Sequence, residues 1–492
     1  MLNPLLLTAL AITGAIALWG ILDTGGLAAV ASRLVDVMFR SRGWFIMLTV
    51  SVQAIVCTWL VFSRYAGIRL GRDDEEPEFS TVSWLTMLFA AGMGVGLLYW
   101  GAAEPITHFL VARDYAPPSE AASRALFITN FHWGLHAWAV YGLTGLVIAY
   151  FGFRRGCPQL MSAPLQSVFG TNGWTRSIGG LCDLLAIVAI AIGLGGSVAM
   201  GVFQVQQGME TLLGIDGGRS LALGVFVVVC LVYFPATVMD LGKGMAVLSN
   251  VAMGVALSLL VFLLLAGPTS FLMNGVTEAI GRYATGVFPQ GFRTYTFFDS
   301  KVTEWFSSWT LSFMVWWLAW APFVGVFIAR ISRGRTIREY LLGVLLVPTA
   351  FSILWFSVFG GLGFYVAHQG DGAMLEVVRT NPADATFFLL AQMPLPWLTS
   401  AATIVAAFLF IVTSVVSAAY VLAMFSSGGD PNPPAPVKLA WGAVLGALGL
   451  VMILSDSIDA VKAIIALGAM PFVFIVSLLT VCLLKALRAD AT

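Results

Sequence analysis

Long apolar segments constrain the fold of this chain more than any other feature of its sequence. A helix needs about 20 predominantly apolar residues to cross a bilayer, and twelve segments meet that requirement. They are residues 4–22, 44–63, 82–102, 131–151, 180–207, 219–239, 245–266, 306–329, 340–362, 398–424, 437–455 and 463–486. Only 10% of all residues are charged, whereas a soluble domain carries about 25%. The sequence therefore predicts an all-α, polytopic membrane protein with twelve transmembrane helices.

The arginine-rich loop at residues 330–338 predicts the orientation of these helices. It contains Arg330, Arg333, Arg335 and Arg338 and no acidic residue, and short loops rich in Lys and Arg stay on the cytoplasmic side. An even number of helices places both termini on the same side. We therefore expect both termini in the cytoplasm and the protein in the cell inner (plasma) membrane. The first apolar segment has no Lys or Arg before it, which indicates a retained helix and not a cleaved signal.

Two apolar segments carry glycine or proline where a continuous helix would be expected. Segment 82–102 contains GMGVG, and segment 306–329 contains WAPFVG with Pro322. Such interruptions free backbone groups that lipid cannot satisfy, so they occur where a helix lines a cavity or packs against protein. If segments three to seven and eight to twelve form two units, each unit begins with an interrupted helix, as at the central site of inverted-repeat transporters. The alternative is close helix packing, because GMGVG also contains a GxxxG pattern.

This pattern divides the chain into four parts. Residues 1–80 hold two N-terminal helices, 81–266 the first five-helix unit, 267–305 a mixed outer segment, and 306–492 the second five-helix unit. The mixed segment is too polar to span a membrane, and its residues 270–285 predict an amphipathic helix along the outer interface.

Tryptophan in the middle of apolar segments gives the strongest indication of function. Two clusters lie well inside predicted helices: Trp316, Trp317 and Trp320 in segment 306–329, and Trp133, Trp138 and Tyr141 in segment 131–151. Membrane tryptophans usually lie at helix ends, where the indole N–H stays hydrated. A central cluster therefore favours another use, the binding of a cation such as a quaternary ammonium group on the ring faces. The alternative is that these side chains are bulky packing residues.

Charged residues are absent from the centres of the third, fourth, eighth and tenth apolar segments. Ionisable residues inside a membrane are costly and mark ion or proton paths, so their absence argues against an anionic substrate held by arginine. No compensating carboxylate is required, because ring faces can stabilise a cation by themselves. Backbone amides freed at the GMGVG interruption could bind a carboxylate on the same solute.

Two other patterns could bind a metal ion, and both have simpler explanations. His132 and His136 are four residues apart on one predicted helix face, a spacing that a metal site can use. No Cys or acid lies near them, since Glu104 is distant in sequence, so we expect structural hydrogen bonds instead. Thr413 and Ser414 could offer hydroxyl ligands to a small cation, although such residues also hydrogen-bond between membrane helices. We expect neither an enzyme nor a cofactor, and the net charge of zero gives no indication of a nucleic-acid partner.

Four motifs give the chain a resemblance to the betaine–carnitine–choline transporter family over nearly its whole length. They are GMGVGLLYWGAAEP (92–105), FHWGLHAWAVYG (131–142), WWLAWAPFVGVFIARISRGRTIRE (316–339) and VTS (412–414). The resemblance implies a LeuT-like fold, in which two extra helices precede two inverted five-helix repeats, helices 3–7 and 8–12. It also implies a homotrimer and substrates with a quaternary ammonium or similar onium group.

The resemblance also implies roles for individual residues. The family's central aromatic box corresponds here to Trp133, Trp138, Tyr141 and Trp317. Trp316 and Trp320 match residues that line the site or its cytoplasmic path, Tyr99 matches an aromatic gate, and Met93 and Gly94 lie at the interruption next to the box. The sodium site of related carriers corresponds to Ala90, Met93, Phe410, Thr413 and Ser414.

Together, the residues and the resemblance predict a secondary-active uptake transporter that works by alternating access. Its expected substrate is a trimethylammonium or other onium solute, such as choline, glycine betaine or carnitine, and its expected coupling ion is sodium. A proton-coupled or sodium-independent exchange carrier of the same fold is the nearest alternative. A channel and a membrane enzyme built on His132 and His136 are the others.

Overall fold

A computed structural model describes residues 3–92, 94–239, 242–369 and 372–490, apart from the side chains of residues 89–92 and 242–246. In this described part of the chain, helices form almost all of the regular structure, and the only β-type pairing is a single bridge between Arg69 and Thr336. Eleven helical segments are long and apolar enough to cross a membrane. The prediction of an all-α, polytopic membrane protein is confirmed.

Most of the predicted apolar segments correspond to one long helix each. These helices are α1 (Pro4–Leu22), α2 (Thr24–Phe62), α8 (Gly173–Leu213), α9 (Gly218–Val238), α10 (Gly242–Ala266), α14 (Ile337–Gln369), α17 (Pro396–Ser426) and α18 (Ala435–Leu454). Other segments are composite. One consists of α5 (Pro118–Trp133), α6 (Leu135–Ala149) and the π-turn η1 (Tyr150–Arg154), one of α12 (Ser300–Phe306), the π-turn η2 (Ser307–Leu311) and α13 (Ser312–Ile331), and one of α19 (Ile458–Ala469) and α20 (Phe472–Asp490). Shorter elements outside the predicted segments include α7 (Ala163–Phe169), α15 (Ala373–Thr380) and α16 (Ala385–Ala391).

The predicted segment 82–102 is divided in two. Helices α3 (Thr81–Gly92) and α4 (Val95–Ala112) flank Met93, which lies outside the described residues, and Gly94 has an extended backbone. The predicted interruption at GMGVG is therefore confirmed. Neither half is among the eleven candidate spans, so the number twelve and the inverted five-helix repeats stay predictions.

The helix through WAPFVG is continuous, so the interruption predicted there is wrong. Helix α13 runs past Pro322 without a break. A proline removes only one backbone donor, and neighbouring helices can accommodate that loss without ending the helix. The irregular backbone of this segment lies earlier, in the π-turn η2.

Segment 131–151 is interrupted at Gly134, which separates α5 from α6. Helix α11 (Thr269–Gly291) brings Tyr283 to this break, where its hydroxyl oxygen accepts a hydrogen bond from the Leu135 backbone N–H at 2.6 Å. A side chain at position 134 would overlap the Tyr283 hydroxyl. Glycine at position 134 therefore leaves room for Tyr283, which is distant in sequence and accepts the hydrogen bond from the Leu135 N–H that the break frees.

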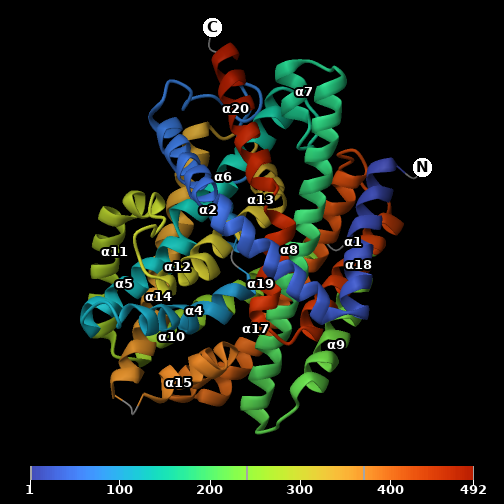
Figure 1. Cartoon of the computed structure of the whole chain (residues 1–492). Helices are drawn as coiled ribbons and strands as arrows, with labels where there is room; N and C mark the ends of the chain where they lie inside the picture. The colour runs from blue at the N-terminus through green and yellow to red at the C-terminus, as the bar shows by residue number, and fades with distance from the viewer. Residues whose placement is uncertain (1–2, 93, 240–241, 370–371, 491–492) are drawn as a thin grey trace.

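Helix α11 confirms the amphipathic helix predicted at residues 270–285. Leu272, Val276, Ala279 and Tyr283 are buried at intervals of three and four residues, and the helix packs on α5 and α14. Most residues between them are exposed. In Figure 1 the helix lies at the left edge of the bundle. Its position along a membrane interface stays a prediction.

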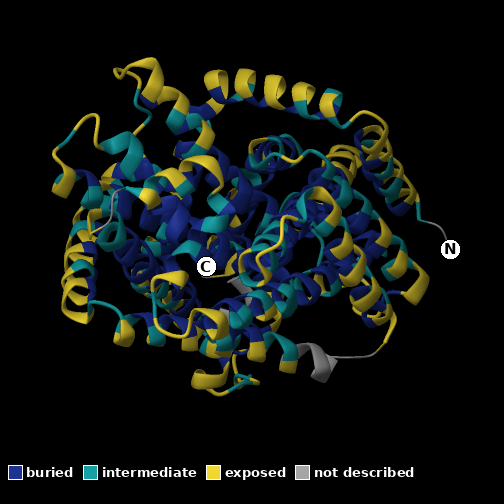
Figure 2. Cartoon of the chain, turned by 90° about the horizontal axis from the view of Figure 1, so that it is seen from below, coloured by how far each residue is buried: buried dark blue, intermediate teal, exposed yellow. Residues whose placement is uncertain are grey.

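Helix α8 lies in the middle of the bundle (Figure 1) and packs against α13, α17, α18 and α19. Its central residues 186–202 are buried on every side and, apart from Ser197, apolar, as expected for a helix surrounded by other helices. Helix α13 in turn packs along α6. Figure 2 shows buried residues filling the middle of the molecule and exposed residues forming its rim. The helices that surround this interior position the candidate site.

The arginine-rich loop 330–338 is held at one end of the bundle. Arg333 forms an ion pair with Glu75 at 2.6 Å in the loop that follows α2. Arg154 pairs with Asp73 of the same loop at 2.7 Å, and this hydrogen bond, together with the arginine charge, lowers the pKa of Asp73 below its usual value. These contacts bring arginines from separate parts of the chain to the same end of the molecule.

Candidate functional site

A central cavity lies between α4, α5, α8, α13 and α17. About 580 Å³ of space, part of it open to solvent, lies between these helices, and about 40 Å³ of it is free to the centre of a water-sized sphere. Its walls are mostly apolar and aromatic: Gly94, Val95, Gly96, Trp100, Trp133, Leu194, Ser197, Val198, Met200, Phe313, Trp316, Trp317, Trp320, Phe410, Ile411, Ser414 and Val415. Five of the residues predicted for substrate binding line this cavity, namely Gly94, Trp133, Trp316, Trp317 and Trp320.

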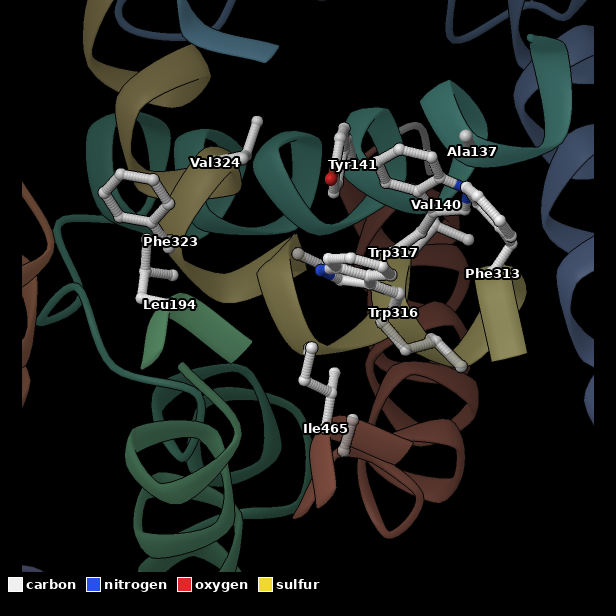
Figure 3. Packing of buried hydrophobic residues seen from close by; sticks show 14 of the residues in the cluster. Ala137, Val140, Tyr141, Leu194, Phe313, Trp316, Trp317, Phe323, Val324 and Ile465 are labelled. Carbon is white, nitrogen blue, oxygen red and sulfur yellow. The ribbon is translucent and has the colours of Figure 1, made fainter. Parts of the chain in front are cut away.

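The predicted aromatic box forms one continuous cluster of rings. The ring centroids of Trp133 and Trp317 are 5.0 Å apart at an interplanar angle of 72°. Tyr141 packs edge-on against Trp317 at 5.8 Å and against Trp138 at 5.5 Å. Figure 3 shows Tyr141 on α6 beside the part of α13 that carries Trp317. Trp133 and Trp317 line the cavity, whereas Trp138 and Tyr141 do not.

Hydrogen bonds at the Gly134 break hold the Trp317 ring. Its Nε1–H donates to the backbone carbonyl of His132 at 2.7 Å, and the Ser352 hydroxyl donates to the backbone carbonyl of Trp133 at 3.0 Å. Carbonyl groups at the end of a helix have no intrahelical partner. The end of α5 therefore supplies the acceptor that fixes the orientation of Trp317.

Glu104 corrects one of the sequence-based expectations. Its Oε2 accepts a hydrogen bond from Trp133 Nε1 at 2.7 Å, and its Oε1 lies 2.7 Å from His132 Nδ1 and 3.2 Å from His108 Nε2. The prediction that no acid lies near His132 is therefore wrong. Helix α4 continues beyond residue 102 and packs against α5, which brings together residues far apart in sequence.

The hydrogen bonds around Glu104 fix the roles of the two histidines. Trp305 Nε1 donates to His108 Nδ1 at 3.0 Å, so His108 carries its proton on Nε2 and donates it to Glu104. His132 contacts Glu104 through Nδ1 and the Thr310 hydroxyl, 2.9 Å away, through Nε2. The three ligand atoms lie within 4.8 Å of one another, close enough to share a metal ion, but each already has a partner. The structural hydrogen bonding expected for His132 is confirmed.

His136 does not act together with His132. The Gly134 break separates the two residues, so they do not share one helix face as predicted. The ring of His136 packs against Phe131 at 4.7 Å, and neither ring nitrogen has a hydrogen-bond partner in the described part of the chain. The cluster of potential metal ligands contains His132 but not His136. The basis for a membrane enzyme built on this pair is therefore lost.

Two tryptophan N–H groups at the cavity have no acceptor among the residues that the structure describes. Trp100 Nε1 and Trp320 Nε1 are buried and without a hydrogen-bond partner in the described part of the chain. The N-terminus of α4 also lies at the cavity, since Gly94 and Val95 line it. Gly94 is the N-cap of this helix and has no side chain that could accept a hydrogen bond from its first N–H groups. Helix N-termini carry partial positive charge and unpaired N–H groups. The cavity thus combines ring faces for a cation with donors for a carboxylate or hydroxyl group.

The residues predicted to bind sodium are only partly described. Met93 lies outside the described residues, as does the side chain of Ala90. Phe410 and Ser414 line the cavity, and the Thr413 hydroxyl donates to the Leu409 carbonyl at 2.9 Å. Their roles in ion binding stay predictions.

The motif around Tyr99 contains a cavity residue that the sequence analysis missed. Tyr99 is buried, packs against Trp100 at 4.7 Å, and does not line the cavity, so its gating role stays a prediction. Trp100 and Phe313 do line the cavity. Trp100 lies only two residues from the end of the predicted segment 82–102, so the criterion applied to the other tryptophans did not select it, whereas helix α4 continues to Ala112.

Comparisons with known proteins agree on one family. A family model described as betaine/carnitine/choline family transporter matches residues 4–492. The glycine betaine transporter OpuD of Bacillus subtilis is 38% identical over 485 residues, which cover 98% of this chain and 93% of the relative. A probable glycine betaine transporter of Desulfitobacterium hafniense is 36% identical over 491 residues, which cover 98% of both chains. The high-affinity choline transport protein of Escherichia coli is 33% identical over 464 residues, covering 93% of this chain and 68% of the relative.

Proposed function

Because the chain belongs to the betaine/carnitine/choline transporter family, we propose that it takes up an onium solute such as glycine betaine, choline or carnitine by secondary-active transport. The observation that carries this proposal is the central cavity lined by Trp133, Trp316, Trp317 and Trp320. A desolvated cation–π contact contributes about 2 kcal/mol, so several of them approach the roughly 8 kcal/mol of micromolar binding before ordering costs are subtracted. The family is one of transporters and not of enzymes.

Sodium is the proposed coupling ion. Phe410 and Ser414 line the cavity, with Thr413 beside them on α17, and Gly94 at the interruption between α3 and α4 lines the same cavity. Ser and Thr hydroxyls and freed backbone carbonyls are the oxygen ligands that a small cation needs. A sodium ion bound there would link the α17 helix to the interrupted segment.

Proton coupling is the second candidate. The observation that favours it is the buried contact of Glu104 with His132 and His108, because chains of carboxylates and histidines mark proton paths in membrane carriers. Sodium-independent exchange of the same solutes remains a further alternative.

Uptake into proteoliposomes distinguishes these candidates. Radiolabelled glycine betaine, choline and carnitine are each supplied with an inward sodium gradient, an inward proton gradient, or neither. We expect accumulation only under the sodium gradient. Accumulation under the proton gradient, or only by exchange against preloaded solute, would retain the onium site and contradict sodium coupling. No uptake of any onium solute would reject the proposed function.

Thr413→Ala is expected to raise the sodium concentration needed for half-maximal uptake. Loss of one oxygen ligand, or of a group that orients a ligand, typically lowers metal affinity about 10–100-fold. Thr403→Ala is a matched control on the same helix, because the Thr403 hydroxyl also donates to a backbone carbonyl of its own helix and does not line the cavity. Equal sodium dependence in the two variants would count against an ion site at Thr413.

Gly96→Ala is expected to weaken glycine betaine binding roughly tenfold. A Cβ atom at this position would lie 2.9 Å from the Trp133 ring, so the ring must move, and such overpacking costs about 1–3 kcal/mol. Gly281→Ala on α11 provides the comparison, because its Cβ would meet nothing within 4 Å and the residue does not line the cavity. Calorimetric titration of both purified variants measures the difference, and equal affinities would show that room at Gly96 is not needed to place Trp133.

The proposed topology has both termini in the cytoplasm, together with the arginine-rich loop 330–338. Helix α20 supports a common side, because Asp490 near its end pairs with Arg155 at 2.7 Å. Asn3 supports it at the other end of the chain, since its side chain donates to the Ser426 carbonyl at 3.4 Å.

A homotrimer is the proposed assembly, and cross-linking in native membranes tests it.

A further inference from the structure

Lys462 is a buried cation that the site described so far does not use. It lies on α19, its side chain is only 6% exposed, and its ammonium nitrogen is 3.7 Å from the ring centroid of Trp309 and 5.0 Å from that of Trp100. Its ion-pair partner Asp459 is 3.8 Å away, and the Asp459 side chain is 85% exposed. A pair with so exposed a partner stabilises little. The two ring faces therefore provide the main stabilisation of this charge.

The position of this lysine is unfavourable for stability. It lies in the second turn of α19, where a positive charge gains no stabilisation from the helix dipole. A buried ammonium group also loses its hydration. An ionisable residue kept inside a membrane protein under these conditions is a candidate for a functional role.

Trp100 connects Lys462 to the central cavity. The same indole ring contacts the ammonium group, lines the cavity, and has an Nε1–H without a hydrogen-bond partner in the described part of the chain. A ligand in the cavity is therefore separated from the lysine charge by a single ring. The free N–H offers that ligand a hydrogen bond on the lysine side of the cavity.

Glu104 places a charge of opposite sign behind a neighbouring ring. Its carboxylate accepts the hydrogen bond from Trp133 Nε1. The rings of Trp133 and Trp100 both border Gly96. The cavity thus has a carboxylate behind one ring and an ammonium group behind the next, an arrangement that matches a solute with a cation and an anion in one molecule.

We propose that Lys462 is a specificity-determining residue that makes the site favour a zwitterionic onium solute bearing a carboxylate over a solute that carries positive charge alone. The onium group lies against Trp133 and Trp317, and the carboxylate accepts a hydrogen bond from Trp100 on the side of Lys462. This inference rests on the proposed function, because it concerns the same site.

Equilibrium binding of glycine betaine and choline to the purified full-length protein tests this inference. The two solutes share a trimethylammonium group and differ in a carboxylate against a hydroxyl group. At an effective dielectric constant of about 20 and a distance of about 10 Å, one unit charge changes the affinity for a carboxylate roughly tenfold. We expect Lys462→Met, which keeps an apolar stem, to lower the ratio of glycine betaine affinity to choline affinity by this factor, because the repulsion between Lys462 and the onium group is common to both solutes. Lys462→Arg keeps the charge and is expected to retain the wild-type ratio.

Lys438→Met on α18 is the control for loss of a positive charge elsewhere, and we expect it to leave the ratio of glycine betaine affinity to choline affinity unchanged. If Lys462→Met does not fold, Lys462→Gln provides the same comparison. If Lys462→Met lowered the affinities for glycine betaine and choline equally, or left the ratio of these two affinities unchanged, the role of Lys462 would be overturned and the proposed function would stand. Failure of the wild-type protein to bind either solute would reject the proposed function and this inference with it.

Discussion

Replacing Trp317 with alanine is expected to weaken glycine betaine and choline binding roughly 100-fold. The change removes a ring face from the cavity wall, worth about 2 kcal/mol as a desolvated cation–π contact. It also leaves the His132 carbonyl without its donor, which adds about 1 kcal/mol. Titration of the purified variant by calorimetry measures the loss.

Two matched variants separate the contributions of Trp317. Trp317→Phe keeps an aromatic face but cannot donate to His132, so we expect it to bind more tightly than the alanine variant and less tightly than the wild type. Trp44→Ala removes a tryptophan that is 58% exposed on α2, and we expect wild-type affinity. Binding by Trp317→Ala within threefold of the wild type would contradict an aromatic cation site at this position.

Glu104→Gln is expected to destabilise the protein and to weaken onium binding at the same time. The carboxylate accepts hydrogen bonds from Trp133, His132 and His108, whereas a glutamine has a single acceptor oxygen and an added donor. Leaving a buried donor unpaired costs about 1–3 kcal/mol, and breaking a buried charged network costs about 3–5 kcal/mol. We therefore expect a clearly lower midpoint of thermal unfolding and a lower affinity for both solutes.

The Trp133→Phe background tests whether Glu104 acts through the indole. Phenylalanine lacks the N–H that Glu104 accepts, so the loss of affinity caused by Glu104→Gln is expected to be smaller in this background. Glu278→Gln on the exposed face of α11 is the control and is expected to change neither property. If the two changes at Glu104 and Trp133 were fully additive in binding free energy, Glu104 would not position Trp133.

Local sequence patterns predicted the helices and one of the breaks. The glycines of GMGVG indicated the interruption between α3 and α4, because three glycines in five residues weaken a helix regardless of its surroundings. The break predicted at Pro322 was wrong because the effect of a single proline does depend on its surroundings. A single proline removes one hydrogen bond, and whether the helix then ends depends on the helices packed around it, which the sequence does not reveal.

Contacts between distant parts of the chain could not be predicted. The break at Gly134 depends on Tyr283, which reaches it from α11, and the histidine network depends on Glu104, which reaches it from α4. Neither contact can be recognised from the sequence of a single helix. Helical periodicity did place Trp138 and Tyr141 side by side, but which rings reach the cavity depends on how α6 packs against α13.

The central claim is that the cavity recognises an onium charge through ring faces. Binding of glycine betaine is compared with binding of 3,3-dimethylbutanoate, in which an uncharged carbon replaces the ammonium nitrogen and the shape and carboxylate are retained. The account predicts that the uncharged isostere binds at least 100-fold more weakly, because it loses cation–π contacts of about 2 kcal/mol each. Affinities within threefold of each other would show that the cavity selects shape and apolar surface, and would contradict recognition of the cation.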